Sequence, residues 1–264
     1  MSTATNPVPT ATLDTSGTAR VPFARLVSVE LRKMWDTRAG LWLLGSIVVV
    51  TAAFMLIFFF VADSQDRSFE NFIGFAATPQ GFLLPVLGIL LVTQEWGQRT
   101  AMVTFAIEPS RPRVIAAKVV AALLFGAAAF VAAILTAALF TAVGGSGDGF
   151  GDLSVALFAL FLLLQLLGII QGLAYGLLLL NSPAAIVAFF VLPIASSIIF
   201  NVVPGLRDVA QWFDLNTAQQ PLFDLGTGES LTGEEWANLA SATSIWVILP
   251  FVLGLVRVMR AELK

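Results

Sequence analysis

Residues 94–118 read QEWGQRTAMVTFAIEPSRPRVIAAK and lie between two long apolar runs. Residues 100–107 are mostly apolar with helical spacing, and the sequence PSRPR at 109–113 breaks that helix before the next apolar run begins. Ser110 is a candidate N-cap, and Pro112 fits the first turn of the helix that follows. A short apolar helix in a loop must be covered by the membrane interface or by a groove on another protein. The stretch therefore predicts a helix that docks on a partner or, alternatively, an interfacial turn held by lipid phosphates.

The composition is that of an integral membrane protein. Of the 264 residues, 58% are hydrophobic and only 12% are charged, and the mean hydropathy is +0.89. The absence of cysteine excludes disulfides and thiol chemistry, and the absence of histidine removes the commonest general base and metal ligand. We therefore expect no catalytic residues and no metal site.

The chain contains enough uncharged apolar sequence for six membrane-spanning helices, which predicts an all-α fold. The spans are expected at about 41–62, 75–95, 114–143, 153–180, 184–203 and 238–257. Pro79, Gly81 and Pro85 interrupt the second of these runs. Its helix can therefore begin anywhere from Phe72 to Gly81. The fourth and fifth spans form a hairpin around a tight turn at Asn181-Ser182-Pro183.

The other segments are assigned by composition. Residues 1–20 are rich in Thr, Ala, Pro and Ser, which predicts a disordered cytoplasmic tail. Residues 21–39 have the apolar spacing of an interfacial amphipathic helix, although a solvated basic helix is the alternative. The residues of this helix that we expect to contact the membrane interface are Arg25, Arg32, Lys33 and Trp35. Residues 40–264 form the six-helix transmembrane domain, with a cytoplasmic loop at 95–113 and an outer segment at 204–231. The outer segment is expected to close an outer gate or to rest passively on lipid headgroups.

Basic residues are distributed unevenly between the two predicted sides of the membrane. Twelve of the 14 fall in segments assigned to the inside, and two fall outside. This excess predicts that both termini are cytoplasmic. The inside set is Arg20, Arg25, Arg32, Lys33, Arg38, Arg99, Arg111, Arg113, Lys118, Arg257, Arg260 and Lys264, and the outside set is Arg67 and Arg207.

Several kinds of energy coupling and catalysis are excluded. The three lysines, Lys33, Lys118 and Lys264, follow Arg, Ala and Leu, so the chain has no Gly-Lys-Ser/Thr nucleotide-binding loop. Glu95 is the ionisable residue nearest the hydrocarbon, and it lies at the inner boundary. Its position argues against an ion-coupled carrier and against an intramembrane protease. The chain is therefore not expected to be an enzyme.

The residues around the loop resemble a known family. They are Glu95-Trp96, Thr100, Pro109-Ser110-Arg111 and Ala117-Lys118, with a weaker match at Trp246, Pro250, Gly254, Arg257, Arg260, Glu262 and Lys264. These positions are similar to those of permease subunits of bacterial ATP-binding-cassette (ABC) transporters of the type-2, exporter-like class. The family often has glycine at the position where Arg99 stands here.

The resemblance implies a transmembrane subunit in the bacterial cytoplasmic membrane, energised by a separate ATPase. Two ATPase copies would hold the ATP and Mg, and a second permease copy or a homologue would complete the pathway. The uncharged spans favour export of an amphiphilic or lipid-like compound; membrane lipid is a further expected partner, and nucleic acid is not. The alternative is a non-transporting membrane scaffold or immunity protein. A channel ranks below both because the spans lack rings of charge.

The ATPase is expected to dock on the loop and on the helix at 21–39. The expected coupling residues are Glu95, Arg99, Thr100, Met102, Phe105, Ile107, Arg111, Arg113 and Lys118. Glu95 would pair with Arg99, four residues later. The three later cations would hold the loop against lipid phosphate or acidic groups of the ATPase. Substitution of Phe105 or Ile107 by aspartate is expected to abolish docking.

Small and polar residues mark one face of the fourth span. Gly168, Gly172 and Gly176 repeat every four residues, so another helix can approach this face closely. The polar residues of the fourth and fifth spans are Gln165, Gln171, Tyr175, Ser197 and Asn201. They can line a substrate path or serve helix packing, and packing explains them at least as well.

Overall fold

The computed structural model describes residues 20–145, 149–151, 154–227 and 230–261. These residues form helices and no strand, and six helical segments are long and apolar enough to cross a membrane. The prediction of an all-α membrane protein with six spans is confirmed. Apart from Arg20, the predicted tail lies outside the described residues.

The six spans are α2 (Arg38–Val61), α3 (Phe69–Gly97), α5 (Arg111–Gly144), α6 (Val155–Leu179), α7 (Ser182–Val202) and a last span that joins α10 (Gly233–Thr243), the π-helical turn η3 (Ser244–Ile248) and α11 (Leu249–Arg260). The other elements are α1 (Phe23–Asp36), α4 (Ala101–Ile107) and the short helices η1 (Arg207–Val209), α8 (Ala210–Phe213), α9 (Leu215–Gln219) and η2 (Gln220–Thr227).

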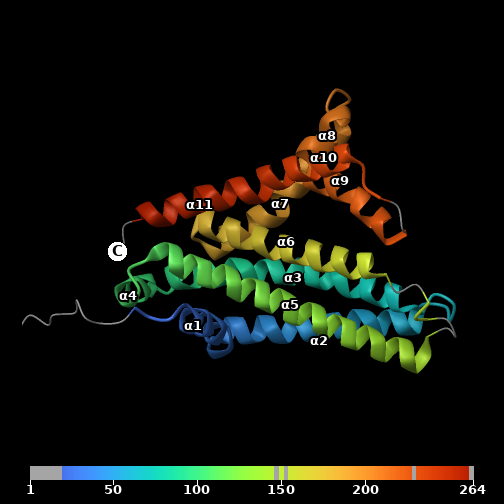
Figure 1. The fold of residues 1–264 in the computed structure, drawn as a ribbon, viewed down its shortest axis with the longest axis horizontal. Coiled ribbons are helices and arrows are strands. Elements are labelled where there is room, and N and C mark those ends of the chain that lie inside the picture. Colours follow the sequence, from blue (N-terminus) through green and yellow to red (C-terminus); the bar gives the residue numbers. More distant parts are fainter. Residues whose placement is uncertain (1–19, 146–148, 152–153, 228–229, 262–264) are drawn as a thin grey trace, which may run out of the picture.

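The central helix of the bundle is α3 (Figure 1). It packs most extensively on α6, it also contacts α2 and α5, and α7 and α11 pack on α6. Its first residue is Phe69, earlier than the predicted start near residue 75, and the helix continues through Pro79 and Pro85. Both prolines are buried. Membrane helices tolerate such prolines because neighbouring helices and local adjustments satisfy the freed backbone groups.

Glycines let the backbones of α3 and α6 approach each other. A Cβ added to Gly172 would lie 2.1 Å from the carbonyl oxygen of Pro85, and one added to Gly88 would lie 2.3 Å from that of Ile169. Gly176 meets the same helix one turn later. The close approach predicted for this face of the fourth span is therefore present.

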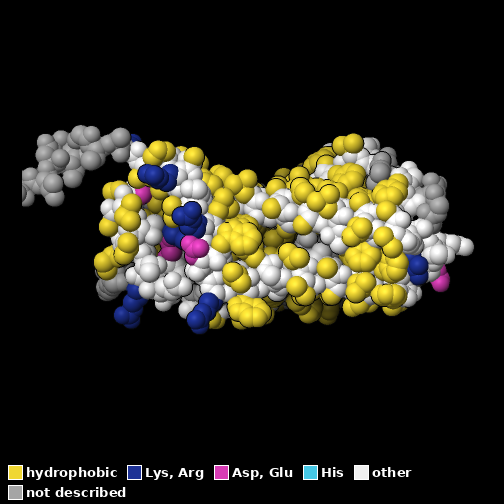
Figure 2. Space-filling model, turned by 90° about the horizontal axis from the view of Figure 1, so that it is seen from below, with side chains coloured by type: hydrophobic (Ala, Val, Ile, Leu, Met, Phe, Trp, Pro, Cys, Tyr) yellow, Lys and Arg dark blue, Asp and Glu magenta, His cyan; other side chains and the backbone are white. Residues whose placement is uncertain are grey.

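The helices α1 and α4 and the last residues of α11 lie at one end of the bundle, which we call the α4 end (Figure 1). In Figure 2, Lys and Arg side chains gather at the end of the molecule that carries α1, whereas hydrophobic side chains cover most of the remaining face. The predicted helix at 21–39 is divided at Thr37, whose hydroxyl accepts a hydrogen bond from the Gly40 N–H at 3.2 Å and caps α2.

The outer segment is folded against α7 and the last span. The carboxylate of Asp214, which is 1% exposed, accepts a hydrogen bond from the Ser197 hydroxyl at 2.9 Å and one from the Thr217 N–H at 3.0 Å. The indole of Trp246 donates to the Phe213 carbonyl at 2.7 Å. These contacts attach α8 and α9 to two spans. The segment thus folds into short helices that pack on the bundle.

Candidate functional site

Four charged side chains form a buried ion network at the α4 end. Glu30 and Lys33 come from α1, Glu95 comes from α3, and Lys118 comes from α5. The Lys118 ammonium lies 2.6 Å from a Glu30 oxygen and 3.1 Å from a Glu95 oxygen. Lys33 lies 2.7 Å from Glu30 and also pairs with Glu95. The two carboxylates and two ammonium groups sum to zero charge.

The network is satisfied by neutral groups as well as by charge. The Lys118 ammonium also donates to the Leu91 carbonyl of α3 at 2.9 Å, and the Thr104 hydroxyl of α4 donates to Glu95 at 3.3 Å. Glu30, Glu95 and Lys118 are each at most 5% exposed. Charges buried this deeply persist only when each has a partner, because their lost hydration is otherwise uncompensated. The network therefore holds α1, α3, α4 and α5 in one arrangement.

Lys33 is the most exposed member of the network, with 32% of its side chain accessible. Burial lowers its pKa, but the adjacent Glu30 and Glu95 carboxylates outweigh that effect, so the pKa lies above its ordinary value. A raised lysine pKa contributes stability that is complete at neutral pH and is lost only as pH rises through the raised value. Lys33 therefore keeps its charge throughout the physiological range.

The orientation of α4 separates its apolar residues into two groups. Phe105 is 8% exposed and packs in the core, with the Arg111 guanidinium 5.2 Å from the centre of its ring. Met102, Val103 and Ile107 are 48%, 60% and 68% exposed. The expectation that Phe105 faces a partner is wrong, because this side chain joins the helix to the bundle.

The predicted pair between Glu95 and Arg99 is absent. The helix α3 ends at Gly97, and Arg99 has a left-handed backbone with φ 58°. Glu95 and Arg99 therefore do not lie on one continuous helix, and their side chains do not face each other as those of residues four apart on a helix do. Glu95 is instead paired with lysines of two other helices, and Arg99 is exposed. Thr100 stands at the N-cap of α4 without a side-chain capping bond.

The predicted loop cations are bonded within the chain. Arg111 donates to the backbone carbonyls of Val258, Met259 and Ala261 at 2.6 to 3.0 Å, so it caps the end of α11. Arg113 pairs with Glu108 at 2.9 Å. Lys118 belongs to the ion network. All three cations thus make contacts within the chain, whereas their predicted contacts with lipid phosphate or an ATPase stay a prediction. Ser110 precedes α5 but makes no side-chain capping bond.

A groove of about 580 Å³ lies between α1 and α4. Its walls include the exposed Val103 and Ile107 of α4 and the exposed Arg25 and Val29 of α1. Lys33 and Glu95 also line it, so the ion network borders the groove. The remaining marked residues of α1, Arg32 and Trp35, are exposed and do not line the groove. The groove thus combines apolar walls with a charged border.

Glu30 is the member of the network that sequence analysis missed. It lies between Val27 and Met34 on the buried face of α1. An acidic residue inside the apolar stripe of an amphipathic helix is a signal, because a buried carboxylate requires a buried cation. That signal gives no information about which lysine supplies the cation.

The marked residues of the fourth and fifth spans have several roles. Gly172 and Gly176 serve the α3–α6 contact, Gln165 donates to the Gly126 carbonyl of α5, and Asn201 donates to the Ser197 carbonyl. The Gln171 Nε2 and the Tyr175 hydroxyl, four residues apart on α6, are buried within reach of each other and have no other hydrogen-bond partner among the described residues. Packing thus accounts for the glycines but not for every polar group.

A comparison with models of known protein families finds none that matches this chain, and a comparison with curated proteins finds no match either.

Proposed function

We propose that the chain is the transmembrane subunit of an ABC transporter, driven by a separate ATPase that docks in the groove between α1 and α4. The observation that carries the proposal is the ion network, which connects the two walls of the groove to the spans α3 and α5. In this proposal the α4 end faces the cytoplasm of a bacterium. Two permease subunits and two ATPases form the transporter, which exports an amphiphilic or lipid-like compound.

The proposed coupling follows the connections of α4. A push on this helix reaches α3 through the hydrogen bond from Thr104 to Glu95 and through the packing of Phe105. A push on α1 reaches α3 and α5 through Glu30 and Lys33. Because all four helices share one buried network, closure of the ATPases would move them together rather than separately. Such a rigid shift changes which side of the membrane the pathway faces.

Substitution of Val103 and Ile107 by aspartate is expected to lower the amount of co-purified ATPase at least about tenfold, because an unpaired carboxylate in an apolar interface is costly. Both side chains are exposed and line the groove, so the fold itself should persist. The measurement is the ATPase-to-permease ratio after purification of the tagged chain from its native membrane in mild detergent.

Met259→Asp is the matched control, because Met259 is an exposed apolar residue near the same end but outside the groove. This variant should retain the wild-type ratio. A wild-type ratio in the Val103→Asp, Ile107→Asp double variant would contradict docking in the groove. Consistent absence of any ATPase from the wild-type preparation would favour the scaffold or immunity protein instead.

A further inference from the structure

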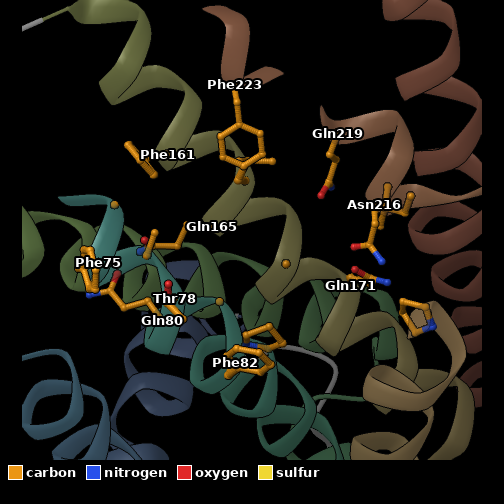
Figure 3. Close-up of a pocket in the computed structure, with 18 of the residues that line it drawn as sticks. Phe75, Thr78, Gln80, Phe82, Phe161, Gln165, Gln171, Asn216, Gln219 and Phe223 are labelled. Atoms are coloured by element: carbon orange, nitrogen blue, oxygen red, sulfur yellow. The ribbon is translucent and has the colours of Figure 1, made fainter. Parts of the chain in front are cut away.

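Two hollows of the molecule differ in their charge. The larger is a cavity of about 820 Å³ between α3, α6, α7 and the outer helices α9 and η2, and phenylalanines and side-chain amides line it (Figure 3). Among the described residues in its walls there is no Lys or Arg, and the one acidic residue is Glu70. The groove between α1 and α4 is lined by five charged side chains. The groove is therefore the hollow in which charge can select the occupant.

The carboxylates in the groove are neutralised from behind. Glu30, Glu95 and Glu108 are only 3 to 6% exposed. The first two pair with the lysines of the ion network, and Glu108 pairs with Arg113 at 2.9 Å. Lys118 and Arg113 take part in these pairs but do not line the groove. The lining alone has two cations and three carboxylates, whereas the lining with these two partners has four cations and three carboxylates.

Arg25 is the cation left over. It lines the groove from the first turn of α1, it is exposed, and it forms no ion pair among the described residues. Lys33 adds positive charge to the same opening, because 32% of its side chain is accessible while its carboxylate partners are at most 6% accessible. The charge that the groove presents to a partner is therefore positive, although its lining contains more acids than bases.

The surface around the groove has the same sign. Arg32, Arg38 and Arg99 are exposed at the α4 end, where Figure 2 shows that Lys and Arg side chains gather. Asp36 is the one exposed acid in the described part of α1, α4 and the loops that flank α4, and it does not line the groove. A positive surface of this kind attracts an acidic one.

The position of α4 favours a protein partner over lipid. The helix α5 has 34 residues, about 51 Å at 1.5 Å per residue, whereas the hydrocarbon core is about 30 Å thick. All its charged residues lie between Arg111 and Lys118, so this end of α5 projects from the core. Because α4 precedes Arg111, lipid tails in the core do not reach the exposed Val103 and Ile107. A protein surface with both apolar and acidic side chains can cover them.

We propose that the ATPase presents an acidic amphipathic segment to the groove. Its carboxylates pair with Arg25 and with the accessible part of Lys33, and its apolar side chains pack on Val103 and Ile107. This inference rests on the proposed function, because it names the chemistry of the partner at the same site. Charge pairs of this kind fix which partner docks and in which register.

The first test identifies the occupant directly. The photoreactive residue p-benzoylphenylalanine replaces Val29, an exposed groove residue of α1, in the full-length chain in its native membrane. Mass spectrometry of the cross-linked peptide is expected to give an ATPase segment with Asp or Glu within about one helical turn, roughly four residues, of the cross-link. An ATPase segment without such acids would overturn this inference alone. Adducts with lipid alone, or with this chain alone, would overturn the inference and the proposed docking together.

The second test changes the charge. Arg25→Glu is expected to lower the amount of co-purified ATPase at least about tenfold, because it sets like charges against each other. Arg25→Lys keeps the charge and should stay within about twofold of the wild type. Arg32→Glu is the matched control, because Arg32 is exposed on the same helix but outside the groove, and it too should stay within about twofold. Wild-type thermal unfolding midpoints show that the variants fold.

The outcomes separate this inference from the proposed function. If Arg25→Glu retains the ATPase while the Val103→Asp, Ile107→Asp variant loses it, the groove docks an ATPase whose contact segment is not acidic. Equal losses in Arg25→Glu and Arg32→Glu would assign the effect to the general positive surface and would overturn the pairing with Arg25. Absence of any ATPase from the wild-type preparation would overturn both.

Discussion

Substitution of Lys118 by methionine is expected to lower the free energy of unfolding by about 3–5 kcal/mol, because it leaves buried carboxylates without enough cations. Lys118 is 3% exposed and contacts both Glu30 and Glu95. After the substitution, Lys33 alone would face two carboxylates. The measurement is unfolding in mixed micelles with increasing dodecyl sulfate, followed by tryptophan fluorescence.

Restoring the charge balance should restore much of the stability. Adding Glu30→Gln to Lys118→Met leaves one carboxylate, Glu95, and one ammonium, Lys33, which already pair. The double variant is therefore expected to be more stable than Lys118→Met alone. Arg32→Met, at an exposed position of the same α1 helix, should change stability by less than about 0.5 kcal/mol. If Lys118→Met were as stable as the wild type, the network would not hold the helices together.

Gly172→Ala is expected to destabilise the bundle by about 1–3 kcal/mol, the usual range for overpacking a core. The added methyl group would lie 2.1 Å from the Pro85 carbonyl oxygen, and backbone atoms cannot move aside as a flexible side chain can. The helices α3 and α6, which share the most extensive contact of the bundle, would have to separate. The same unfolding titration measures the effect.

Gly168→Ala is the matched substitution one turn earlier on the same helix. Its added methyl group would lie 3.6 Å from a Pro85 side-chain atom, an ordinary van der Waals distance. Stability should therefore change by less than about 0.5 kcal/mol. Equal losses in Gly168→Ala and Gly172→Ala would indicate a general cost of alanine on this face and would contradict the specific backbone contact.

Much of the fold could be predicted from local sequence. The number of spans follows from uncharged apolar runs, and the short helix at 101–107 follows from apolar spacing ended by proline. The start of α3 could not be predicted from its prolines. Prolines such as Pro79 and Pro85 break helices in water, but here both are buried inside the bundle, an environment in which membrane helices tolerate proline.

The location of the candidate site could be predicted from the sequence, but the ion pairs that Glu95 forms there could not. Glu95 and Lys118 were both expected to matter in the loop, yet the nearest cation in sequence, Arg99, is not a partner of Glu95. The partners of Glu95 are Lys118 of α5 and Lys33 of α1, and Lys33 is 62 residues away from it. Residues four apart interact only where the helix continues, and α3 ends at Gly97, before Arg99.

The sequence by itself determined that this is a helical membrane protein with six spans and an apolar helix in the 95–113 loop. These properties depend on hydropathy and periodicity, which are sums over neighbouring residues. Only the tertiary structure decided that Phe105 points inward and Ile107 outward, and that Glu30 joins Lys118. Those outcomes depend on which helices lie side by side, because short-range forces such as ion pairing and packing act across contacts that local patterns do not encode.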